Sequence, residues 1–124
     1  MRFVCLFHVD AELIGQLSPA ELERFDLDNR EADAALIKSG HYVSALALAG
    51  AGEAVTVRRR AGQASATDGP YAETKEQLGG ILIIEARDMA EAVEIAKLGP
   101  MADYGTVEVR PELNVGWQRE QQGR

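Results

Sequence analysis

The spacing of apolar residues along this chain is typical of strands in some segments and of helices in others. Large apolar residues crowd residues 2–9 and predict a first strand. The segment Ser18-Pro19-Ala20-Glu21 predicts a helix start, because serine can cap, proline suits the first helical position and glutamate completes a capping box. Apolar residues then recur at helical spacing up to a stop at Gly40. They are Leu22, Phe25, Ala32 and Leu36.

The second half of the chain contains shorter elements of both kinds. We expect a strand over 41–49, a hairpin of strands 55–60 and 63–67 turning at Ala61-Gly62, a strand over 81–84 and a last strand over 106–110. A second capping box, Asp88 to Glu91, predicts a helix that runs to Leu98 and stops at Gly99-Pro100.

With the hairpin set aside, this order is strand, helix, strand, strand, helix, strand. It predicts an α+β, ferredoxin-like βαββαβ fold, with both helices on one face of an antiparallel sheet. Three strands are apolar at consecutive positions, 3–7, 43–48 and 81–84, as is typical of strands buried on both faces. Because two helices cover only one face, we expect a homodimer with the sheets stacked ~10 Å apart.

Length and charge narrow the class of protein. The 124 residues fit one domain, 1–124, in which 118–124 reads as a frayed polar tail. The net charge of −7 disfavours nucleic acid or an anionic membrane as the main partner. With no signal segment or apolar span in view, we expect a cytoplasmic protein. Cys5, the sole cysteine, lies in an apolar run and reads as a buried, inert thiol.

The segment 67–80 concentrates turn residues, charges and glycines just before an apolar strand. Asp68-Gly69-Pro70 is a turn in which Asp68 either fixes the backbone or is a carboxylate at a pocket mouth, a general base or polar anchor. The Tyr71 ring can pack against apolar neighbours, or its hydroxyl can form a directed hydrogen bond. Thr74 to Gln77 predicts a single capped helical turn, and Gly79-Gly80 permits either a sharp re-entry into the sheet or close backbone approach to a neighbour.

Three further polar residues are candidates for a site. His8 closes the first strand, where strand ends can flank a pocket, and it is the better of two histidines for acid–base chemistry. His41 opens the second strand, and Asn29 falls on the apolar helix line as a core-edge or a pocket residue. Two distant histidines are a weak metal signal, and the chain carries no phosphate loop, nucleophile elbow or dinucleotide fingerprint. We therefore expect no metal and no cofactor.

The stretch Asp68-Gly-Pro-Tyr-Ala-Glu-Thr-Lys-Glu-Gln-Leu-Gly-Gly80, with Gly40-His-Tyr-Val43 and Val107-Glu-Val-Arg-Pro111, closely resembles the YCII-related proteins of the DGPF type. Tyr71 stands where that signature usually has phenylalanine. The resemblance implies a dimeric α/β barrel and a small bacterial protein, in some cases associated with sigma factors. Relatives with a histidine–aspartate pair suggest an enzyme. Asp68 could match their acidic residue, but no histidine here can be matched to the pair.

Two functions follow as hypotheses. One is a homodimer with a small-molecule pocket near the signature loop, acting as an enzyme that needs no cofactor, with Asp68 and His8 as catalytic residues and Tyr71, Asn29 and His41 as ligand-binding ones. The alternative is a non-catalytic binding or regulatory module tied to a sigma factor or another protein. The acidic surface and the lack of a complete catalytic constellation fit this second hypothesis.

Overall fold

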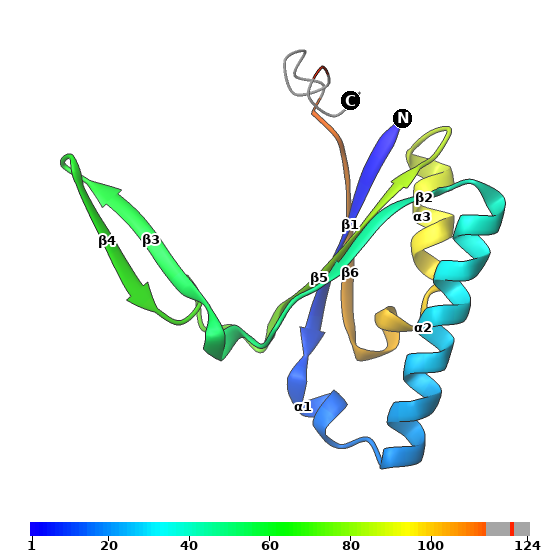
Figure 1. The fold of residues 1–124 in the computed structure, drawn as a ribbon, viewed down its shortest axis with the longest axis horizontal. Coiled ribbons are helices and arrows are strands. Elements are labelled where there is room, and N and C mark those ends of the chain that lie inside the picture. The colour runs from blue at the N-terminus through cyan, green and yellow to red at the C-terminus, as the bar shows by residue number, and fades with distance from the viewer. Residues whose placement is uncertain (114–119, 121–124) are drawn as a thin grey trace.

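A computed structural model describes residues 1–113 and Glu120 of this chain. The tail predicted from Gln118 lies outside these residues, apart from Glu120. Strands and helices follow the expected order, with the short helix α1 added after the first strand (Figure 1). The strands are β1 Arg2–Asp10, β2 Tyr42–Ala47, β3 Val55–Arg60, β4 Gln63–Asp68, β5 Glu76–Glu85 and β6 Gly105–Pro111. The helices are α1 Ala11–Gly15, α2 Pro19–Ser39 and α3 Met89–Leu98, with 3₁₀ turns at Ala51–Glu53 and Pro100–Tyr104.

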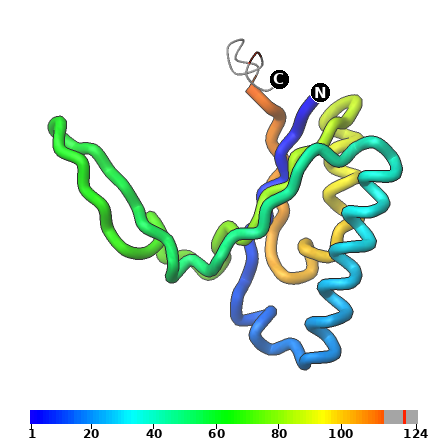
Figure 2. The backbone as a smooth tube through the Cα atoms, in the orientation of Figure 1, coloured from blue at the N-terminus to red at the C-terminus, as the bar shows by residue number. Residues whose placement is uncertain are grey.

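The main sheet has four antiparallel strands in the order β2-β5-β1-β6. This order, with α2 and α3 on one face, confirms the ferredoxin-like α+β fold (Figure 1). The hairpin β3–β4 forms a separate two-stranded sheet that projects on the other side (Figure 1). Figure 2 shows the two segments that join it to the main sheet running side by side. Of the described residues, no helix is long and apolar enough to cross a membrane.

The core lies between the sheet and the helices. Phe3 pairs with Ile84 and Cys5 with Leu82 across β1 and β5, and all four side chains are buried. Because side chains alternate along a strand, the residues between them point to the opposite face, where they are only partly buried. These open-face residues are Val4, Leu6, Ile81 and Ile83.

Local sequence signals account for the helix ends. Ser18 and Glu21 form the predicted capping box of α2, and Gly40 ends that helix in the left-handed conformation, at φ 81°. Asp88 caps α3 by accepting a hydrogen bond from the Glu91 amide at 2.9 Å. The second capping box is therefore only half as predicted. The Glu91 carboxylate accepts a hydrogen bond from the Arg87 amide, one residue before the expected donor, the Asp88 amide.

Three expectations about the middle of the chain need correction. The second strand ends at Ala47 rather than at 49. The helical turn predicted at Thr74–Gln77 is absent, since β5 already begins at Glu76. Its polar groups still find partners, because the Gln77 amide donates to the Thr74 carbonyl and hydroxyl. The strand expected over 81–84 begins five residues earlier, at Glu76, because two polar residues and two glycines interrupt the apolar pattern there.

The hairpin matches its sequence signal. Arg60 pairs with Gln63 across a two-residue turn in which Ala61 and Gly62 have φ of 51° and 78°. Positive φ at both turn residues suits the right-handed twist of a tight hairpin. Apart from Thr56, the side chains of β3 and β4 are exposed in a single chain.

Candidate functional site

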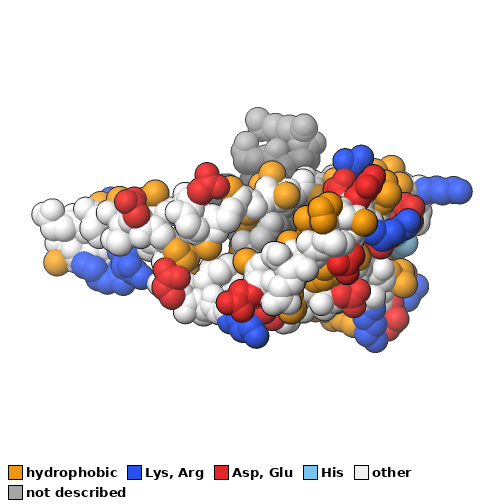
Figure 3. All heavy atoms as spheres, turned by 90° about the horizontal axis from the view of Figure 1, so that it is seen from below, with side chains coloured by type: hydrophobic (Ala, Val, Ile, Leu, Met, Phe, Trp, Pro, Cys, Tyr) orange, Lys and Arg blue, Asp and Glu red, His pale blue; other side chains and the backbone are white. Residues whose placement is uncertain are grey.

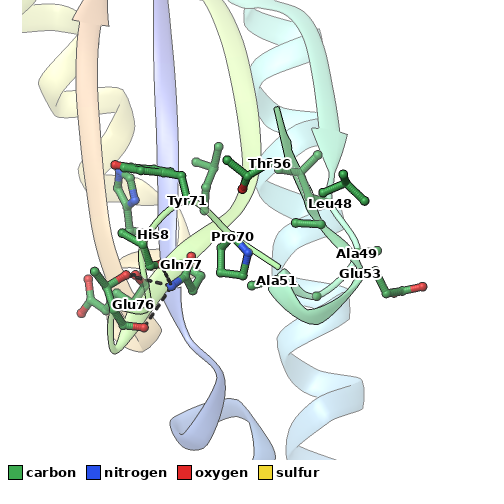
Figure 4. Close-up of a pocket in the computed structure, with 16 residues that line it drawn as sticks. His8, Leu48, Ala49, Ala51, Glu53, Thr56, Pro70, Tyr71, Glu76 and Gln77 are labelled. Atoms are coloured by element: carbon green, nitrogen blue, oxygen red, sulfur yellow. Dashed lines mark hydrogen bonds between the residues drawn. The ribbon is translucent and has the colours of Figure 1, made fainter. Parts of the chain in front are cut away.

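A cleft of about 620 Å³ lies where the main sheet meets the base of the hairpin (Figure 4). Its walls come from the end of β1, the segment after β2, the start of β3 and the loop and strand that follow β4. Most of the lining side chains are apolar or small, and His8, Thr56, Tyr71 and Gln77 are among the polar ones. Such a cleft, mostly apolar with a few polar groups, is typical of small-molecule sites.

His8 is held by a carboxylate on the neighbouring strand. In the β1–β6 register Leu6 pairs with Glu108 and His8 with Thr106, so that Glu108 is a diagonal neighbour of His8 on the same face. The His8 Nε2 lies 3.1 Å from Glu108 Oε1. An ionised carboxylate only accepts, so Nε2 carries the proton and Nδ1 of the neutral ring remains an acceptor.

The same carboxylate is fixed from a second side. Arg110 donates from Nε to Glu108 Oε2 at 2.9 Å. The hydrogen bond from His8, followed by the one from Arg110, lowers the pKa of Glu108 below its usual 4.5. Glu108 therefore stays ionised at neutral pH and orients the imidazole.

A β-bulge positions His8 at the cleft. Phe7 pairs with Gly80 but His8 pairs with Leu78, so Gly79 is the extra residue on β5. Bulges of this kind turn a side chain relative to the regular pleat. A Cβ on Gly79 would lie 2.8 Å from the side-chain Cγ2 of Val9, which explains a glycine here. The expected close backbone approach is found at Gly80, where a Cβ would lie 3.0 Å from the Leu46 carbonyl oxygen.

The signature loop is tied to the end of β1 by a buried carboxylate. Asp10 is 3% exposed, accepts from the Glu12 amide at 3.0 Å and lies 3.5 Å from Lys75 Nζ. The Gln77 amide closes the loop from inside by donating to the carbonyls of Ala72 and Thr74 (Figure 4). These bonds fix the segment that carries Tyr71 over the cleft.

The structure brings together two of the five predicted site residues. His8 and Tyr71 both line the cleft, whereas Asp68 is exposed at the end of β4 and is not among its lining residues (Figure 4). Within the described residues the Asp68 carboxylate makes no hydrogen bond or ion pair. Backbone bonding holds the turn instead, with the Gly69 amide 2.7 Å from the Ala54 carbonyl.

The other two predicted residues lie on the helix side of the sheet. His41 contacts Ser39 at 2.7 Å and Glu91 at 3.4 Å. Asn29 donates to the Phe25 carbonyl at 3.1 Å, as expected of a core-edge residue. Neither lines the cleft. In the part of the chain that the structure describes, no three potential metal ligands cluster.

Sequence reasoning missed Glu108. Its position in Val107-Glu-Val-Arg predicts only that it shares a face with Arg110. The signal that identifies it is the register of β6 against β1, which brings residues 100 positions apart into contact.

Fold and site together define a small ferredoxin-like protein with a cleft beside its sheet. The chain belongs to the YCII-related domain family, whose model matches residues 1–114. It is 32% identical over 113 residues to an uncharacterized protein, R00369, of Rhizobium meliloti (strain 1021), covering 90% of this chain and 91% of that one. A similar solved structure is the 5-chloro-2-hydroxyhydroquinone dehydrochlorinase from Burkholderia phenoliruptrix AC1100 in complex with 2,5-dihydroxybenzoquinone. It has a TM-score of 0.47 and 17% identity, covering 93% of this chain and 96% of that one.

Proposed function

We propose that this protein is a homodimer that binds a small molecule in the cleft and acts on it by proton transfer, without a cofactor. The observation that carries the proposal is the hydrogen bond between His8 and Glu108 beside an apolar cleft. Histidine changes charge near neutral pH, so an imidazole in a cleft is suited to accept and return a proton.

The chemistry assigns a separate role to each group. His8 accepts the substrate proton at Nδ1, and Glu108 holds the ring and stabilises the imidazolium that forms. Tyr71 supplies part of the cleft wall and a hydroxyl. Asp68, next to the turn that leads into the cleft, remains a predicted anchor at its mouth.

The open face of the sheet supports the homodimer. The partly buried apolar residues of β1 and β5 continue into Leu46 on β2, which is 59% exposed. Removing such a surface from water is favourable by about 25 cal/mol for each Å² of apolar area. A second copy presents the same surface, so that two open faces can cover one another.

A thermal-shift screen of metabolites tests the site. We expect a ligand that stabilises the wild type and the control Glu94→Gln, whose side chain lies exposed on α3, but not His8→Ala. At ~100 times its dissociation constant a ligand stabilises the native state by about 2.7 kcal/mol. Glu108→Gln should still bind the ligand but lose turnover. Asp68→Asn, measured in parallel, tests whether Asp68 anchors the ligand at the mouth of the cleft.

Two results would contradict the proposal. A ligand that His8→Ala binds as well as the wild type would place the site elsewhere. A folded wild type that no metabolite stabilises would favour the non-catalytic module, whose partner could then be sought among sigma factors.

A further inference from the structure

The hairpin β3–β4, here called the arm (residues 55–68), is poorly supported within its own chain. Within the described part of the chain its strands pair only with each other, and Val55 and Val57 are 58% and 70% exposed. Among the described residues, the bonds at its base are the Gly69 amide to the Ala54 carbonyl, the Thr56 hydroxyl to the Gly69 carbonyl and a long bond of 3.4 Å from the Arg58 guanidinium to the Tyr71 carbonyl. An isolated two-stranded hairpin is at best marginally stable in water, so the arm needs a further surface to pack against.

The two faces of the arm differ in polarity. Val57 pairs with Ala66, Val55 with Asp68 and Arg59 with Ala64, so one face carries the two valines and two alanines, with Asp68 at one end and Arg59 at the other. The opposite face is polar throughout, with residues Thr56, Arg58, Arg60, Gln63, Ser65 and Thr67. Alternation of this kind is typical of strands that bury one face.

The charge of the arm is opposite to that of the rest of the chain. Its three arginines and one carboxylate give the arm a net charge of +2. Because the whole chain carries −7, the rest of the chain carries −9. Figure 3 shows hydrophobic and basic side chains exposed on the arm where it extends from the body. A surface of this charge is attracted to the acidic body of a second copy.

The arm also has a defined position relative to the open face. It projects on the side of the sheet away from α2 and α3, so that the arm and the open face form the two walls of a V (Figure 1). The cleft with His8 lies where the two walls meet. A second copy seated on the open face therefore lies beside the arm and across the opening of the cleft.

We propose that the arm is a dimerisation element, which packs its valine face against a second copy seated on the open face, and that this second copy closes the cleft over His8. The inference rests on the proposed homodimer and adds that the site is complete only in the assembled pair. Each copy clasps the other by the same contact, as twofold symmetry requires.

Two arginine variants of the full chain test this assignment. Val57→Arg places a charge on the apolar face, and Thr67→Arg places the same charge on the polar face as the matched control. Both positions are exposed in the single chain, so each variant should fold, which circular dichroism checks. By light scattering we expect wild type and Thr67→Arg at twice the 13.4 kDa chain mass and Val57→Arg at the single mass.

The closure of the cleft is read from histidine reactivity towards diethyl pyrocarbonate, quantified on peptides by mass spectrometry. His41 is the internal reference, because its side chain is 30% exposed against 33% for His8 and it lies on the helix side of the sheet. We expect His8 to react several-fold more slowly than His41 in the wild type and in Thr67→Arg, and the difference to vanish in Val57→Arg.

The outcomes separate this inference from the proposed function. A wild type of single mass would overturn the homodimer and the arm contact together. A dimer that Val57→Arg leaves intact, with His8 still protected, would remove the arm contact alone. A Val57→Arg monomer in which His8 reacts as in the wild type would show that the second copy does not close the cleft.

Discussion

The contact between β1 and β6 at Gly105 gives a prediction that can be worked from distances. Gly105 pairs with Val9, and a Cβ built on it would lie 1.9 Å from the His8 carbonyl oxygen. Ordinary contact begins at 3.4 Å, so an alanine here must displace one strand by about 1.5 Å. The obstacle is backbone, so no side-chain rotation can relieve it.

We expect Gly105→Ala to lower the free energy of unfolding by about 2–4 kcal/mol. About 1–3 kcal/mol is the usual cost of overpacking, and about 1 kcal/mol is the net value of a hydrogen bond lost between the strands. For a domain of this size the melting temperature should fall by about 8–16 °C. Urea titration and a thermal scan, both followed by circular dichroism, measure the change.

Gly99→Ala is the matched control, because among the described residues no heavy atom beyond its chain neighbours lies within 4 Å of its Cβ position, and its φ of −81° suits any residue. That variant should stay within about 1 kcal/mol of the wild type. The reasoning is refuted if Gly105→Ala unfolds with the same midpoint as Gly99→Ala, since β6 would then have to sit farther from His8 than the structure places it.

Three further predictions concern the core and the helix cap. Ile84→Ala removes a fully buried side chain and should cost about 2–5 kcal/mol in urea titration; an unchanged midpoint would contradict the described core. Burial raises the pKa of Cys5 to about 11, so iodoacetamide should leave this thiol unmodified by mass spectrometry until urea unfolds the chain. The hydrogen bond from the Ser18 amide lowers the pKa of Glu21 below 4.5, so its stabilising effect is present above that pH and lost as the pH falls through the lowered value. Glu21→Gln should therefore be less stable than the wild type at about pH 7, and the difference should shrink as the pH falls below the lowered pKa; a difference that stays constant in acid would refute the assignment.

Elements with local signals were predicted well. The cap at Ser18, the stop at Gly40 and the turn at Ala61-Gly62 each depend on neighbouring residues, and each lies where expected. The helical turn expected at Thr74 was wrong because its polar side chains satisfy the backbone of an extended loop instead. Turn chemistry alone does not distinguish these two uses of the same groups.

The candidate site depends on pairings between distant residues, which a single sequence does not reveal. His8 was predicted from its place at a strand end, and the cleft includes it. Its partner Glu108 and the buried Asp10 were missed, because each depends on a strand or loop from elsewhere in the chain. Asp68 was predicted as a site residue from its turn motif, but its side chain is exposed and is not part of the cleft lining.

The pairing of Leu48 with Gly79 divides the molecule into the segment 49–78 and the rest of the chain. The Leu48 amide donates to the Gly79 carbonyl at 2.9 Å, so that residues 49–78 form an excursion whose two ends already touch. Lengthening such an excursion costs little, since the entropy of closing a loop grows only with the logarithm of its length. The excursion holds the arm, most of the cleft wall and the first three residues of β5, whereas β1, β2, β6 and the α-helices lie outside it. Selection can therefore remodel the binding surface of this protein through insertions and substitutions in 49–74, while Leu78 and the rest of the sheet that positions His8 stay unchanged.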